Sequence, residues 1–259
     1  MTLRRALLVL LPLLAASAAH ADQDTVTREQ LPDGVHWRME TEHGVVHAWA
    51  PLTYRARRAG VVVYVHGYGT DVDHAWDEQK LAAQFAASGR NALFIVPEAP
   101  ASGAEEPSWP ELGDLLRTVF RDTAVRRPAG ALVVVGHSGA FRTVVPWLAY
   151  TPLDDVILLD GLYGCEEDFR QWLDEARGHA HHRLTLVSLD TRQWAGPFVA
   201  HEQGAETADR VPERIEELSP QQRGARLLNL RSQYDHMDLV LAGKTIPVLL
   251  LRAPLGEAK

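Results

Sequence analysis

Residues 132–140 read LVVVGHSGA, and the fold and the most reactive position of the chain can both be predicted from them. The apolar run at 132–135 is typical of a strand buried on both faces. The segment GHSGA at 136–140 matches G-x-S-x-A, in which small residues two positions either side of the serine permit a sharp strand-to-helix turn. Such a turn lifts the hydroxyl above the sheet edge and directs a helix N-terminus at it. We therefore predict Ser138 as a nucleophile, against the alternative of an idle serine in a Gly-rich turn.

Outward from this segment, buried strands alternate with helices. A hairpin is expected within residues 36–50, and a helix that Asp73 caps is expected to run through Ser88. Alternation of this kind predicts an α/β fold, with a doubly wound, mostly parallel sheet covered by helices on both faces. We expect one domain over 22–259. The further expected strands lie at 61–65, 92–96, 132–135, 156–159, 184–189 and 226–230, and the further helices at 112–125, 139–150 and 168–177. The sequence does not decide whether the polar stretch 191–222 forms a lid or surface loops.

Composition removes several classes of protein. The chain has 259 residues, 46% of them apolar, which fits a globular domain. Its formal net charge of −8 argues against a nucleic-acid partner, because phosphate binding requires clustered Lys and Arg. The single cysteine, Cys165, excludes a disulfide framework, a multi-cysteine zinc site and an iron–sulfur cluster. No apolar run after the N-terminus is long enough to span a membrane, and the oligomeric state stays open.

The N-terminus predicts a secretory signal peptide over residues 1–21. Arg4 and Arg5 precede an apolar run at 6–19, and Ala19-His20-Ala21 offers small residues at both specificity positions of a cleavage site. The run is short for an anchor helix. The expected location is therefore extracellular or periplasmic, where Cys165 stays free or pairs with another molecule. Loss of the two arginines lowers the net charge from −8 to −10.

A second motif, HGYG at 66–69, follows the strand expected at 61–65. Cleavage of an ester or amide passes through an oxyanion that needs two N–H donors. We predict that the backbone N–H groups of Tyr68 and Gly139 supply them. His66 is interpreted as a structural residue that holds this loop.

The chain resembles the α/β-hydrolase superfamily over residues 35–255, on the strength of HGYG, GHSGA and a histidine after the last strand. More loosely, GHSGAFR followed by LLDGLYG is similar to secreted bacterial hydrolases. The resemblance implies a triad of serine, acid and histidine in that chain order, and a serine hydrolase that cleaves esters or amides through an acyl-enzyme on Ser138. A carboxylic ester is favoured over an amide, the substrate is a small molecule or a polymer, and no metal or organic cofactor is expected. An acyltransferase and an inactive binding module are the alternatives.

His236 is the predicted base, because it follows the last expected strand by six residues. His201 is the second choice from chain order. The histidines at 179, 181 and 182 precede a strand at the opposite edge from the nucleophile, and we interpret them as a solvated patch and not as a metal site. Asp160, followed by a glycine turn, is favoured as the acid that orients the base, with Asp190 as the alternative.

Four further side chains are candidates for support. Arg142 lies one helical turn beyond Ser138, where pairing with Glu98 is favoured over contact with a substrate carboxylate. Three tryptophans are either pocket lining or core, and core is favoured for Trp147; they are Trp109, Trp147 and Trp194.

Overall fold

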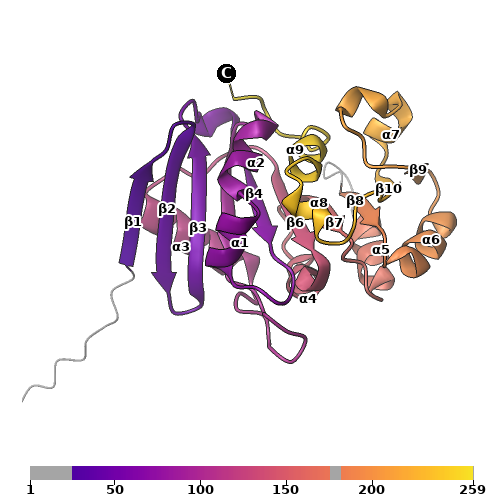
Figure 1. Cartoon of the computed structure of the whole chain (residues 1–259), viewed down its shortest axis with the longest axis horizontal. Helices are drawn as coiled ribbons and strands as arrows, with labels where there is room; N and C mark the ends of the chain where they lie inside the picture. The colour runs from indigo at the N-terminus through magenta and orange to yellow at the C-terminus, as the bar shows by residue number, and fades with distance from the viewer. Residues whose placement is uncertain (1–24, 176–181, 259) are drawn as a thin grey trace, which may run out of the picture.

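A ten-stranded sheet organises the molecule in the computed structural model, which describes residues 25–175 and 182–258 (Figure 1). The strand order is β1-β2-β3-β5-β4-β6-β7-β8-β10-β9. The strands are β1 (Thr25–Gln30), β2 (Gly34–Thr41), β3 (Gly44–Pro51), β4 (Gly60–Val65), β5 (Ala92–Pro97), β6 (Leu132–His137), β7 (Leu153–Leu159), β8 (Arg183–Ser188), β9 (Glu206–Ala208) and β10 (Leu227–Arg231).

Helices lie on both faces of this sheet, as Figure 1 shows. They are α1 (Val72–Glu78), α2 (Leu81–Ser88), α3 (Leu112–Thr123), α4 (Phe141–Trp147), α5 (Glu166–Glu175), α6 (Arg192–His201), α7 (Pro220–Gly224), α8 (Asp238–Leu241) and α9 (Thr245–Leu250), with short 3₁₀ turns η1 (Ala56–Arg58), η2 (Ser138–Ala140) and η3 (Ile215–Glu217). One apolar core joins α3, α4, α5 and α6 to the sheet, and a second joins α1, α2, α8 and α9 to the opposite face.

The predicted fold class is confirmed. From β5 to β9 every neighbouring pair of strands is parallel, whereas β1, β2, β3 and β5 form an antiparallel edge. The central strands are buried along their whole length, as their unbroken apolar runs predict. Because the carboxyl ends of parallel strands share one edge, the loops after β6, β7, β8 and β10 can contribute to one site.

Two local predictions were wrong. The helix expected from Asp73 to Ser88 is two helices, because Lys80 adopts a left-handed backbone at φ +51° between them. Its cap is Asp71, whose side chain accepts from the N–H of His74. Asp73 instead bonds Arg38, at 2.7 and 2.8 Å.

Other differences concern the surface. β1 is exposed at all six positions, so its sequence lacks the apolar alternation that would predict a strand. His182 is 7% exposed and stacks on Trp172, so it is not part of a solvated patch. The stretch 191–222 adds α6 to one face and β9 to the sheet edge. The predicted signal peptide, His179 and His181 lie outside the described residues.

No helix within residues 25–175 and 182–258 has the length and apolar character needed to cross a membrane. Cys165 is partly buried between β7 and α5. Burial and the neighbouring acids, Asp168 and Glu166, raise the pKa of its thiol to about 12. A thiol with this pKa is a poor nucleophile at neutral pH.

Candidate active site

Ser138 lies at the turn between β6 and the helical segment formed by η2 and α4. Its backbone is left-handed, at φ +53°, a strained conformation for an L-residue. Glycines allow the close approach of two neighbouring loops: a Cβ on Gly67 would lie 2.8 Å from the Cβ of Ser138, and one on Gly161 would lie 3.1 Å from its carbonyl oxygen. The HGYG loop and the loop after β7 therefore both pack against the serine.

His236 and Asp160 are hydrogen bonded, with 2.7 Å between Nδ1 and Oδ2. Asp160 is fully buried and, like Ser138, has a left-handed backbone, at φ +47°. The loop after β8 surrounds its carboxylate with donors. Oδ1 accepts from the N–H of Leu189 and from the N–H and hydroxyl of Thr191, and Oδ2 accepts from the N–H of Asp190. The carboxylate is thus fixed from four sides before it meets the imidazole.

The charges of this pair reinforce each other. Burial by itself would raise the pKa of Asp160, but the hydrogen bonds from His236, Leu189 and Thr191 outweigh burial and hold this pKa well below its usual range. The hydrogen bond to Asp160 raises the pKa of His236 above 6.5, against the opposing effect of burial. A buried anion next to an imidazole stabilises the imidazolium that a general base becomes when it accepts a proton.

Asp190, the alternative acid, lies farther from the base. Its Oδ2 is 3.9 Å from Nδ1 of His236, and its side chain is 65% exposed. Its contribution to the arrangement is the backbone N–H that it donates to Asp160. The geometry favours Asp160 as the partner of His236.

Tyr163, in the loop after β7, has its side chain near that of Ser138. Burial and the carboxylates of Asp160 and Asp190 raise the pKa of Tyr163 to about 12, and the interaction with Ser138 opposes this rise. Among the residues described, no hydrogen bond joins Ser138 to His236. Contacts between catalytic groups are commonly long without substrate and tighten when it binds.

Two backbone N–H groups lie beside the serine. Gly139 is the second residue of η2, where an N–H has no partner inside the helix. Within the described ranges, the N–H of Tyr68 meets no acceptor either. The ring of Tyr68 covers Gly139 so closely that a Cβ there would lie 2.6 Å from ring atoms. The two predicted oxyanion donors are therefore neighbours in space.

The predicted pairing of Arg142 with Glu98 was wrong. Glu98 lies 3.1 Å from Nε2 of the buried His66, and its other oxygen accepts from the N–H of Val72. Arg142 donates instead to the carbonyl of Gly103. His66 also bonds the carbonyl of Gly67 at 2.8 Å, which agrees with the structural role expected for it. Glu98 is thus engaged by His66 and by the backbone of Val72, and Arg142 lies on another partner.

Sequence reasoning missed His137, the variable position of the G-x-S-x-A pattern. This ring is buried, and burial followed by the charge of His236 lowers its pKa to about 4. Nε2 of the neutral ring donates to the carbonyl of His236 at 3.2 Å. His137 therefore helps to position the backbone of His236. No sequence pattern predicts this role, because His137 occupies a position of the motif at which many residue types occur.

The remaining candidates lie either apart from Ser138, Asp160 and His236 or next to them. His201 is at the exposed end of α6, bonded to the carbonyl of Pro197. Trp109 and Trp147 are core residues, each 1% exposed. Trp194 is half-buried, and its ring meets Tyr163 edge-on at 5.4 Å. Trp194 therefore contacts Tyr163, whose side chain lies near Ser138.

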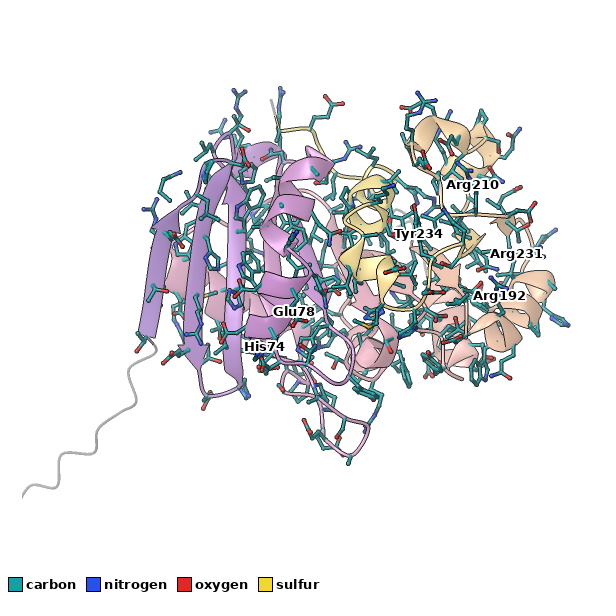
Figure 2. The ribbon with its side chains drawn as sticks, viewed as in Figure 1. His74, Glu78, Arg192, Arg210, Arg231 and Tyr234 are labelled. Carbon is teal, nitrogen blue, oxygen red and sulfur yellow. The ribbon has the colours of Figure 1, made fainter. Side chains whose placement is uncertain are left out.

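A pocket of about 530 Å³ opens beside Tyr68. Its lining carries two carboxylates and no Lys or Arg, and Tyr68 and Met237 are its large exposed apolar side chains. Figure 2 shows His74 and Glu78 on α1, on the same side of the sheet. The lining residues are Gly67, Tyr68, Gly69, Thr70, Asp71, His74, Glu78, Gln79, Ala101, His137 and Met237.

The doubly wound sheet and the serine turn at its carboxyl edge define a class of protein. The family model described as "Alpha/beta hydrolase family" matches residues 62–255. The chain belongs to this family. No match was found among curated protein sequences.

Solved structures share this fold at low sequence identity. S-formylglutathione hydrolase from Agrobacterium tumefaciens has a TM-score of 0.54 at 10% identity, covering 90% of this chain and 100% of that one. Fluorophosphonate-binding serine hydrolase F of Staphylococcus aureus has a TM-score of 0.52 at 10% identity, with coverage of 89% and 98%. The feruloyl esterase module from Clostridium thermocellum has a TM-score of 0.51 at 10% identity, with 87% of each chain covered.

Proposed function

We propose that the protein is a serine hydrolase that cleaves carboxylic esters through an acyl-enzyme on Ser138. The observation that carries the proposal is the 2.7 Å hydrogen bond between His236 and a buried Asp160, in loops beside a serine at a strand-to-helix turn. Membership of the alpha/beta hydrolase family supports it. The named activities of the similar folds, an S-formylglutathione hydrolase and a feruloyl esterase, favour an ester over an amide.

The proposed reaction follows from the positions of these groups. Oγ of Ser138 attacks the ester carbonyl carbon while its proton passes to Nε2 of His236. The oxyanion that forms accepts from the N–H groups of Tyr68 and Gly139. The alcohol then leaves with the proton from His236, and the acyl group stays on Ser138. Water attacks this ester with His236 again as base, which releases the acid and restores the serine.

A fluorophosphonate probe tests the proposal directly, because it labels serines activated by a neighbouring base. We expect stoichiometric labelling at Ser138, mapped by peptide mass spectrometry, together with hydrolysis of p-nitrophenyl acetate. A folded protein that is neither labelled nor active would favour a binding module. Transfer of the acyl group to added alcohol in preference to water would favour an acyltransferase.

The pH dependence of kcat/KM is expected to show an acid limb centred above pH 6.5. The active form of the base is neutral, and the hydrogen bond that His236 donates to Asp160 raises the pKa of His236, so protonation removes activity at a higher pH than for a free histidine. The charge of Asp190 also raises the pKa of His236, by less than Asp160 does, so Asp190→Asn should move the acid limb to a slightly lower pH. Rates measured from pH 5 to 9 check this, and a limb centred below 6.5 would contradict it.

We also propose export of the protein, on the strength of the apolar run and Ala19-His20-Ala21 near its N-terminus. Cleavage is expected after Ala21, which gives a mature chain that begins at Asp22. N-terminal sequencing of protein recovered from the periplasm or medium measures this. Exported material that still begins at Met1 would contradict it.

A further inference from the structure

A second pocket, of about 380 Å³, lies between α6 and the sheet and shares no lining residue with the pocket at Tyr68. Its polar wall comes from three adjacent strands: Ser188 ends β8, Asn229 and Arg231 belong to β10, and Thr207 is in β9. In the parallel ladder Ser188 pairs with Arg231, and Thr207 with Asn229, so these side chains project from the same face. Ligands of α/β proteins commonly bind near the carboxyl ends of such strands.

The buried polar group of this pocket has a free donor. Asn229 is 6% exposed, and its carbonyl oxygen accepts from the hydroxyl of Ser188 at 3.0 Å. Its amide nitrogen has no protein partner in the part of the chain that the structure describes. This nitrogen is not among the buried polar atoms that lack a partner, so it is open to the pocket, where it can donate to an acceptor on a ligand.

Two arginines add charge to the same pocket, and Figure 2 shows them together at the α6 end of the molecule. Arg192 donates to the carbonyls of Ser188 and Ser232 at 3.4 and 3.0 Å, which fixes its guanidinium. Arg231 lies 3.3 Å from a carboxylate oxygen of Asp209, a side chain that is 94% exposed. An ion pair this exposed contributes little to stability, so a bound anion can replace Asp209 at low cost.

We propose that this pocket binds a small oxyanion, a carboxylate or a phosphate. Three of the groups that line it are hydrogen-bond donors, and two of them are cationic: the guanidinium of Arg192, which two backbone carbonyls hold in place, the amide of Asn229, and the exposed guanidinium of Arg231. The chain as a whole carries a net charge of −8, so this is a local feature and not part of a basic surface. Guanidinium groups bind both anions well because their paired N–H groups match two oxygens.

The place of Arg192 in the fold suggests two sources for the anion. Its contacts join the end of β8, just before the loop that holds Asp160, to the start of the loop after β10, which carries His236. The oxyanion is therefore either the charged end of a substrate or a free ion. The first source rests on the proposed function, and the second does not.

Calorimetric titration with inorganic phosphate and with succinate, in a Tris chloride buffer, tests the site without reference to activity. Arg231→Gln is expected to weaken binding of both by about tenfold or more, because a charge-assisted contact is lost. Arg231 is 63% exposed, so this variant should fold. Arg210→Gln is the matched control: Arg210 is an exposed arginine paired with Glu217 and does not line the pocket. Equal affinity of wild type and Arg231→Gln, or no binding at tens of millimolar ligand, would overturn the proposal.

Kinetics separate the two sources. If the anion belongs to the substrate, Arg231→Gln raises KM for an ester that carries a carboxylate but not for a neutral ester, and phosphate competes with the charged ester. If the site instead binds a free ion, phosphate binds in the calorimeter but competes with neither the charged ester nor the neutral ester. Both results support the site. Should the protein hydrolyse no ester, the calorimetry still decides whether the pocket binds anions.

Discussion

Ser138→Ala is expected to reduce kcat for ester hydrolysis by about 10³-fold or more, because groups of a triad act as a unit and the nucleophile has no substitute. The variant should remain folded, since the side chain is small and half-buried, and among the described residues it makes none of the hydrogen bonds that hold the fold together. Steady-state rates and thermal unfolding measure the two quantities. Activity within tenfold of wild type in a folded protein would remove Ser138 from the mechanism.

Ser138→Gly is a sharper control. The backbone here is left-handed at φ +53°, which glycine adopts freely and alanine only with strain. The glycine variant should be as inactive as the alanine variant but more stable than it, by on the order of 1 kcal/mol. A glycine variant less stable than the alanine variant would mean that the turn is not strained.

Asp160→Asn is expected to lower kcat by up to about 10⁴-fold, through the wrong tautomer of His236. Three donors meet Oδ1 of Asp160, two from Thr191 and one from Leu189. The carbonyl oxygen of an asparagine will therefore take that side, and its NH₂ will face His236. Nδ1 must then accept a hydrogen bond, which leaves the proton on Nε2 and prevents Nε2 from accepting the proton of Ser138.

Asp190→Asn is the matched variant for this experiment. Its carboxylate lies 3.9 Å from the same imidazole nitrogen and is largely exposed, so the loss should be mild. Both variants need a folding check by circular dichroism, and Asp160→Ala replaces the asparagine variant if that one fails to fold. If Asp190→Asn were the more damaging change, the orienting role would pass to Asp190.

Much of this architecture could be read from local patterns. Unbroken β-branched runs mark the central strands because both of their faces are buried, and GHSGA marks the turn because small residues are needed there. His236 follows from its place after the last strand. The exposed strand β1 carries no such pattern, and neither does the break at Lys80, where the chain adopts a left-handed backbone without a glycine.

Contacts between distant segments could not be read in the same way. Chain order permits both Asp160 and Asp190 as the acid, and the difference between them lies in the donors that the loop after β8 places around Asp160. The expected pairing of Arg142 with Glu98 rested on charge alone, but His66, in the loop after β4, holds Glu98. His137 and Tyr163 have roles that depend on which loop faces them in space.

The groups that hold Asp160 have a consequence for how this family member can change over time. Three of the four come from the peptide backbone at Leu189, Asp190 and Thr191, and the fourth is one hydroxyl. A backbone N–H is present whatever the side chain, proline excepted. The side chains at positions 189 and 190 can therefore be substituted, and can form new surface contacts, without loss of the hydrogen bonds to Asp160. Only the third is tied to a hydroxyl, so serine is its one conservative replacement.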